Sequence, residues 1–308
     1  MDNFRIVIRA MVLSFKKRRL AVRLWAVNLV FSLFAVAPFF FLMMKHMSHS
    51  FSGEHTLQKL DIFWLGDFIH RYGNVAPAAL GMVLLAIVLY MVLAIFLNGG
   101  IVGCLNRPEA KTTLADFFHD CGHYFWRFFR LFLLFIPGYL ISLAFFLPLL
   151  RTVLNIFSRR AATEWPLVIA SNLRFLAIVL LLTIVAMFSD YVKIGLVTSN
   201  SKKVLRQTGL AWQFIRKRFF RAWGLFLLAG LVYVALTLLY LEIARLLPQN
   251  RPLLVLGAFI WQQFYILCRQ WSKVLFFATG LEFLKQHREP EKAASSGEKN
   301  PGIDNWQG

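Results

Sequence analysis

Long apolar runs alternate with short polar joints along most of the chain, and this pattern predicts helices that cross a membrane. Six such runs are predicted to be spans, and they begin near residues 24, 75, 131, 165, 222 and 252. A membrane-spanning helix needs about 20 predominantly apolar residues. The joints before the first, third and fifth runs combine basic residues with apolar residues at three- and four-residue spacing, which is typical of amphipathic helices on a bilayer surface.

The joint from Ser189 to Phe226 shows this pattern most completely. An apolar helix ends with Asp190 and Lys193, and a polar turn follows. Positions on one face of the next predicted helix are Val204, Thr208, Ala211, Trp212, Ile215 and Phe219. Because basic residues close this helix where a new apolar run begins, we predict that it lies on the bilayer and leads into the next span.

A similar joint occurs 92 residues earlier in the chain. Equivalent residues are Asn98 and Asp190, Gly103 and Gly195, and, after a one-residue gap, Arg127 and Arg218. The segments RFFRLFLLF and RFFRAWGLF, which start at the two arginines, share six of nine residues. The earlier joint also contains Thr113 followed by Asp116, a spacing typical of a capping box at the start of a helix.

A third copy of the joint is indicated at the two ends of the chain. Phe15 precedes a basic cluster as Phe214 does, and Gln270, Trp271 and Lys273 match Asp190, Tyr191 and Lys193. We therefore predict three repeats of one unit, a basic amphipathic helix and a hairpin of two spans, over residues 1–105, 106–200 and 201–286. The alternative is that membrane topology alone places basic residues before the odd-numbered spans.

Composition indicates the same class of protein. Hydrophobic residues make up 58% of the chain, and the mean hydropathy of +0.61 implies more apolar surface than a soluble domain could bury. We expect an all-α integral membrane protein whose six transmembrane helices form a compact bundle of three helical hairpins, with amphipathic interfacial helices on the cytoplasmic side. Residues 1–286 form this domain, and the polar residues 287–308 are predicted to be a disordered cytoplasmic tail.

Charge sets the expected orientation and partners. The joints and the C-terminal end hold 25 of the 34 Lys and Arg residues, and the three opposite loops hold 9. Because basic residues favour the cytoplasmic side, both termini are predicted to be cytoplasmic. The net charge of +19 indicates anionic membrane lipids rather than nucleic acid as partners, since the basic residues crowd the ends of apolar runs.

Two groups of residues are candidates for functional contacts. Lipid headgroups are the expected partners of Arg127, Arg130, Arg216, Lys217, Arg218 and Arg221. Polar contacts within the membrane are expected for Asn98, Asp190, Lys193, Gln262 and Gln263, because polar groups at membrane depth are costly without a partner.

Metal sites are weaker hypotheses. His119 and His123 are four residues apart on one helix face, and His46 and His49 accompany methionines at the start of the first outer loop. Both sets contain metal-ligand chemistry but no complete ligand spacing, so we predict no metal and no cofactor.

Catalytic motifs are missing from the sequence. It contains no serine nucleophile elbow, no phosphate-binding glycine loop and no HExxH motif. We therefore expect a non-enzymatic membrane protein, either a structural or accessory subunit, with a protein partner in a membrane complex, or a lipid-interacting envelope factor. The alternative is a transporter or permease subunit for a small solute, with polar groups between the repeats.

The joint at Asp190-Tyr191-Val192-Lys193 resembles that of a large group of uncharacterised bacterial six-helix inner-membrane proteins, whose corresponding stretch reads Asp-Tyr-x-Arg. Lys193 departs from that arginine. Similar arrangements occur in the membrane domains attached to some glycerophosphodiester phosphodiesterases. The resemblance implies six spans and a bacterial inner-membrane location, and it implies no catalytic residues.

Single cysteines introduced at Ser52, Ser158 and Ser201, with the native cysteines replaced, test the orientation in intact cells. Ser52 and Ser158 lie in predicted outer loops, so they should react with a membrane-impermeant thiol reagent. Ser201 should react only after the cells are opened. Labelling of Ser201 from outside, with Ser52 protected, would mean that the orientation is inverted.

Overall fold

The computed structural model describes residues 2–47, 76–107, 112–158, 165–247 and 252–295, and within these ranges it contains eight helices and no strand. The helices are α1 (Asp2–Lys16), α2 (Arg18–Met47), α5 (Ala76–Asn106), α6 (Leu114–Ser158), α7 (Trp165–Thr198), α8 (Val204–Lys217), α9 (Phe219–Leu246) and α10 (Pro252–Ser295). The all-α prediction is confirmed.

Five stretches of the described helices are long and apolar enough to cross a membrane. They are Arg18–Pro38, Leu80–Asn106, Leu114–Ile141, Ser171–Thr198 and Phe219–Leu246. The expected sixth span, in α10, is not among them, since Gln262, Gln263 and Arg269 interrupt its apolar residues. The chain is thus a multi-pass membrane protein by the length and composition of its helices.

The buried residues gather at one end of the helices, which we call the base. It comprises residues 6–24, 95–107, 117–135, 187–229 and 270–284. Apolar side chains farther along the same helices are exposed, for example Phe34 in α2, Leu85 in α5 and Leu238 in α9. Apolar surface of this extent is typical of helices that face lipid.

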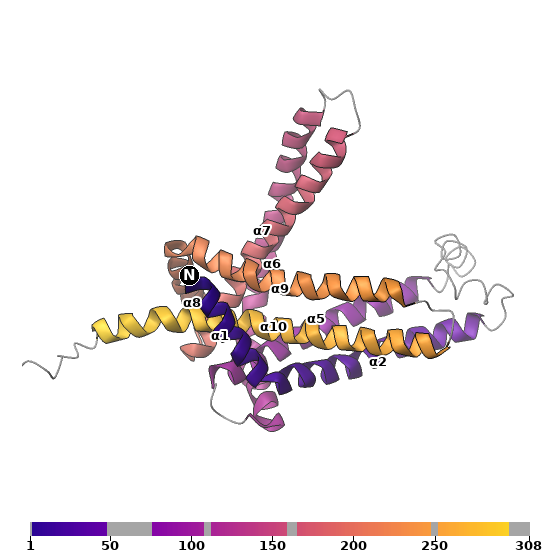
Figure 1. The fold of residues 1–308 in the computed structure, drawn as a ribbon, viewed down its shortest axis with the longest axis horizontal. Helices are drawn as coiled ribbons and strands as arrows, with labels where there is room; N and C mark the ends of the chain where they lie inside the picture. Colours follow the sequence, from indigo (N-terminus) through magenta and orange to yellow (C-terminus); the bar gives the residue numbers. More distant parts are fainter. Residues whose placement is uncertain (1, 48–75, 108–111, 159–164, 248–251, 296–308) are drawn as a thin grey trace, which may run out of the picture.

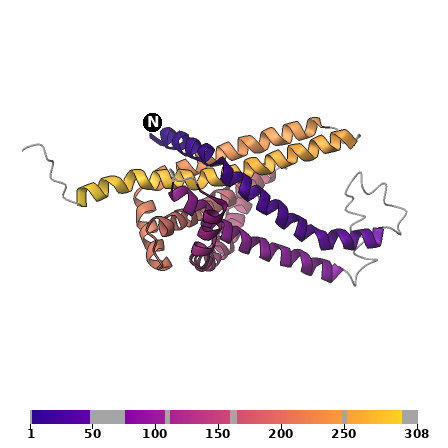
Figure 2. The same cartoon turned by 90° about the horizontal axis from the view of Figure 1, so that it is seen from below.

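The hairpins diverge from the base instead of forming the predicted compact bundle. Helices α2, α5 and α9 and the first part of α10 run to one side of the base, whereas α6 and α7 leave it together in another direction (Figure 1). The pair α9 and α10 also separates from α2 and α5 at the far end (Figure 2). The packed interior therefore lies where the joints are, because that is where buried side chains from all helices meet.

Two of the three joints contain a break between helices. Arg218 lies between α8 and α9 and has the non-helical backbone angles φ −136° and ψ 30°. Lys17 lies between α1 and α2. The second joint differs from the prediction, because its amphipathic helix and the third span form the single helix α6. Its buried face continues in register through Phe117, Phe128 and Phe135, with neither glycine nor proline between residues 122 and 137.

The last helix also extends past its predicted end. α10 continues to Ser295, nine residues into the stretch predicted to be a disordered tail, and residues 296–308 lie outside the described residues. Residues 287–295 include two Glu, two Ala, one Lys and one Arg. These residues favour helix without an apolar pattern, which explains the later end.

Close helix packing at the base depends on glycines in α5. A Cβ atom on Gly100 would lie 2.5 Å from Cys121 Sγ and 2.6 Å from the ring of Phe117, both buried side chains of α6. A Cβ atom on Gly103 would lie equally close to the Asp120 carboxylate. The absence of side chains at these positions lets α6 approach the α5 backbone.

Each amphipathic segment packs against the second helix of a hairpin. The first half of α6 packs on α5, and α8 packs on α7. Helix α1 packs on α10, with the rings of Phe15 and Trp271 4.9 Å apart. The rings of Phe214 in α8 and Tyr191 in α7 are 6.2 Å apart. In the sequence, Phe15 matches Phe214 and Trp271 matches Tyr191. In the structure, the aromatic rings form the equivalent contacts Phe15–Trp271 and Phe214–Tyr191.

We predict opposite effects of alanine at two glycines. Gly100→Ala should lower the free energy of unfolding by about 1–3 kcal/mol, because the added methyl group overpacks the α5–α6 contact. Gly209→Ala, on an open face of α8 with nothing within 4 Å, should raise it by about 0.5–1 kcal/mol. Thermal unfolding of the purified variants measures both. Equal effects would show that α5 and α6 are not closely packed.

Candidate functional site at the base

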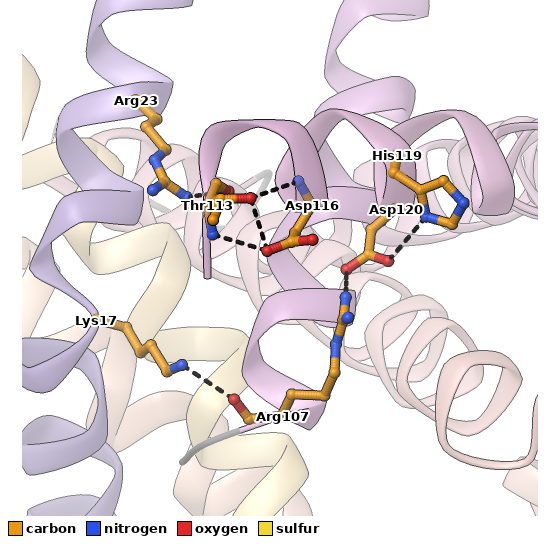
Figure 3. A network of polar contacts seen from close by, with 7 residues as sticks. All are labelled: Lys17, Arg23, Arg107, Thr113, Asp116, His119 and Asp120. Carbon is orange, nitrogen blue, oxygen red and sulfur yellow. Dashed lines mark hydrogen bonds and ion pairs between the residues drawn. The ribbon is translucent and has the colours of Figure 1, made fainter. Parts of the chain in front are cut away.

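Polar side chains at the base form a network that ties α2, α5 and α6 together (Figure 3). At the start of α6, the Thr113 backbone N–H donates to Asp116 Oδ2 at 2.8 Å, and the Asp116 N–H donates to Thr113 Oγ1 at 3.1 Å. This reciprocal pair is a capping box and confirms that prediction.

Two cations from the start of the chain hold the ends of the segment between α5 and α6. Lys17 Nζ donates to the Arg107 carbonyl oxygen at 3.0 Å. The Arg23 guanidinium donates to the carbonyl oxygens of Thr112 at 2.8 Å and Thr113 at 3.1 Å. Burial, together with the charges of Arg107 and Arg23, lowers the pKa of Lys17. The first and second joints are thus linked through backbone carbonyl groups.

Asp120 is the acid at the centre of the network. Its carboxylate is buried and forms an ion pair with Arg107 in the space that Gly103 leaves open. His119 Nδ1 lies 3.7 Å from Asp120 Oδ1. The sequence alone does not reveal this ion pair, because Arg107 lies in the preceding connection and its contact with Asp120 depends on the fold.

The histidines of α6 contact each other and Arg127. The rings of His119 and His123 are stacked with centroids 6.0 Å apart, and the Arg127 guanidinium donates to His123 Nε2 at 3.3 Å. A bound cation at that nitrogen would oppose the guanidinium charge. Among the described residues, no group of three or more His, Cys, Asp or Glu side chains is placed to hold a metal ion. The side chains of His46 and His49 lie outside the described part.

The predicted headgroup contacts fall into two classes. Arg130, Arg216, Lys217 and Arg221 are exposed, and Arg218 is half-buried beside the ring of Phe214. Arg127 instead is buried, and its guanidinium donates to Asn200 Oδ1 at 2.8 Å. Asn200 occupies the turn between α7 and α8 with a positive φ of 46°, a conformation that asparagine tolerates. Arg127 therefore links the second joint to the third.

Gln207 is a buried contact that sequence analysis missed. Its amide lies against Gly195 of α7, where a Cβ atom would approach Gln207 Nε2 to 2.2 Å, and Ser199 Oγ donates to Gln207 Oε1 at 3.2 Å. Gly195 therefore allows α8 to pack closely on α7, as Gly103 allows α6 to pack closely on α5. The equivalence of Gly103 and Gly195 in the two joints was the sequence signal from which this close contact could have been predicted.

In the described part of the chain, the predicted intramembrane polar residues make separate contacts. Asp190 Oδ1 accepts a hydrogen bond from Lys193 Nζ at 2.8 Å, and Asn98 Oδ1 is buried without a hydrogen-bond partner in the described part. Gln263 accepts from Trp25 Nε1 at 3.1 Å and lines a cavity of about 330 Å³ between α2, α5 and α10, while Gln262 is exposed.

Removing the carboxylate of Asp120 tests the network. Asp120→Ala should lower the free energy of unfolding by about 1.5–3 kcal/mol, because it leaves Arg107 unpaired beside two further cations. The matched control is Glu242→Ala, which breaks the exposed ion pair with Arg245 and should cost no more than about 0.5 kcal/mol. Similar losses for both variants, measured by thermal unfolding, would show that the network does not stabilise the base.

Comparison of this chain with protein-family models, with curated proteins and with solved structures finds no match in any of the three. Its function therefore has to be inferred from the geometry of the base and of the helices that leave it.

Proposed function

We propose that this protein is a non-enzymatic multi-pass protein of the bacterial inner membrane that serves as a structural or accessory component and interacts with anionic lipids. The observation that carries the proposal is that its polar groups fall into two sets, one buried and one exposed. Charged groups in the described interior form ion pairs, as in Arg107–Asp120 and Asp190–Lys193, whereas cations of the base such as Arg216 and Lys217 are exposed. Exposed cations beside apolar helices fit the surface of an anionic leaflet.

Six spans are part of this proposal. Each hairpin leaves the base and returns to it, and Phe15 of α1 contacts Trp271 of α10. The meeting of the two ends of the membrane domain supports an even number of crossings. We infer that α10 supplies a sixth crossing beside the five apolar stretches found by length and composition. Of its polar residues, Gln263 accepts a hydrogen bond from Trp25 of α2, and Gln262 and Arg269 are exposed.

Orientation and repeats complete the architecture that we propose. The base carries most of the Lys and Arg residues and faces the cytoplasm, with both termini on that side. The packing of α1 on α10, of α6 on α5 and of α8 on α7 supports three repeats arranged around one axis. In this arrangement α1, which belongs to the first repeat, packs on α10 of the third repeat.

Transport is the less favoured function. A solute pathway would bring Asn98, Asp190, Gln262 and Gln263 to one water-accessible cavity between the repeats. Of these four, only Gln263 lines the described cavity of about 330 Å³ beside α2. The pairing of Asp190 with Lys193 satisfies both charges and supports a structural role for them.

Lipid composition around the protein tests the proposed function. Native membranes are extracted into polymer nanodiscs, and the lipids that accompany the protein are compared with those of the whole membrane. We expect enrichment of anionic phospholipid, which should fall when Arg216, Lys217 and Arg218 are all changed to Gln, since each cation near the surface contributes about 1 kcal/mol. Binding to DNA should be salt-labile and independent of sequence.

A lipid composition equal to that of the bulk membrane, for the wild type, would contradict the lipid-interacting function. If the triple variant retains the same enrichment of anionic phospholipid, the three cations only set the membrane topology and do not bind lipid.

A further inference from the structure

A groove of about 760 Å³ lies between α6 and the start of α8. Its basic lining residues are Arg130, Lys202, Lys203 and Arg206, and no acidic residue lines it. Arg130 comes from the second joint and the other three from the third, so the fold brings together cations that are more than 70 residues apart in the chain. All four are exposed, which leaves their charged ends accessible to a ligand.

The apolar part of the groove lies next to its charges. Leu133 and Leu134 follow Arg130 by one helical turn toward the apolar half of α6, which places them about 5 Å farther along the helix. Leu205, on the opposite wall, is 73% exposed. A ligand that fits both parts has a negatively charged end and an apolar chain that continues into the membrane.

The two walls are held in place by contacts beneath the groove. Arg127 donates to Asn200 at 2.8 Å, one turn before Arg130 on α6 and just before Lys202 on the other wall. Val204 is buried in the core, and the Lys203 N–H donates to Ser201 Oγ at 3.2 Å. The cations are therefore preorganised by the joint, which reduces the entropy lost when a ligand binds.

The start of α8 adds to the same attraction. Lys203 occupies the N-cap position and its side chain makes no capping hydrogen bond. The N–H groups of the first turn lack intrahelical acceptors and carry partial positive charge. They reinforce a site whose main feature is four cations facing an apolar wall.

We propose that this groove binds one anionic phospholipid of the cytoplasmic leaflet, with its phosphate among the four cations and an acyl chain along Leu133, Leu134 and Leu205. The proposal rests on the lipid-interacting function above and adds to it one defined site. The site would bind a lipid at the contact between the second and third repeats, and so would tie α6 to α8.

The test uses the full chain, purified in detergent and titrated with phosphatidylglycerol or phosphatidylcholine, with bound lipid counted by native mass spectrometry. The wild type should retain one phosphatidylglycerol and exchange phosphatidylcholine freely. Changing Arg130, Lys202, Lys203 and Arg206 to Gln should weaken phosphatidylglycerol binding by a factor on the order of 100 or more. The control, with Arg5, Arg9 and Lys16 of α1 changed to Gln, should bind as the wild type does, because these exposed cations lie outside the groove.

Two further measurements identify the ligand and guard against misfolding. Leu133→Ser with Leu205→Ser should weaken phosphatidylglycerol binding, while inorganic phosphate should not displace the lipid from the wild type. Asn200→Gly keeps the backbone conformation of the turn but removes the acceptor of Arg127, so it should weaken binding with all four cations present. Thermal unfolding checks that every variant is folded.

The outcomes separate this site from the general function. Equal loss of phosphatidylglycerol in the groove variant and the α1 variant would overturn the groove and leave a diffuse interaction with anionic lipid. Displacement of the lipid by inorganic phosphate would make the groove a phosphate site. Retention of neither lipid by the wild type, together with nanodiscs of bulk composition, would overturn the proposed function itself.

Discussion

Packing of the amphipathic segments onto the ends of the membrane helices is the constraint on which the rest of the structure depends. The α5 and α7 helices accept their partners through Gly103 and Gly195, where no side chain stands between backbone and partner. The contact of Phe15 with Trp271 joins the first helix to the last. Because these contacts bury residues from every described helix in two adjoining clusters, they define the interior of the protein.

Concentrating the interior at one end has consequences for the rest of the helices. Apolar residues beyond the base are left for lipid, since they gain nothing in water and need no partner in a bilayer. Polar groups are left at the base, where each joint engages the next, as Lys17 does with Arg107 and Arg127 with Asn200. In the function that we propose, the cations that remain exposed contact the leaflet, so that one arrangement serves both assembly and lipid contact.

Local features were predictable from the sequence, and contacts between joints were not. The capping box of Thr113 and Asp116 needs residues three apart, and a span needs only an apolar run. The sequence around Arg127 does not show whether its side chain contacts a lipid headgroup or another residue. In the structure it donates to Asn200, which lies 73 residues away. The divergence of the hairpins and the continuity of α6 likewise depend on packing between helices, which hydrophobic periodicity does not encode.

A cross-link between the first and last helices tests the central claim most directly. Phe15→Cys with Trp271→Cys, in a chain without its native cysteines, is treated with a short bifunctional thiol reagent in native membranes. We predict an intramolecular cross-link found by mass spectrometry, and none for Phe4→Cys with Trp271→Cys, because residue 4 lies about 16 Å farther along α1. The absence of the first cross-link, with both cysteines reactive, would contradict the closure of the base by α1 and the even number of crossings that we propose.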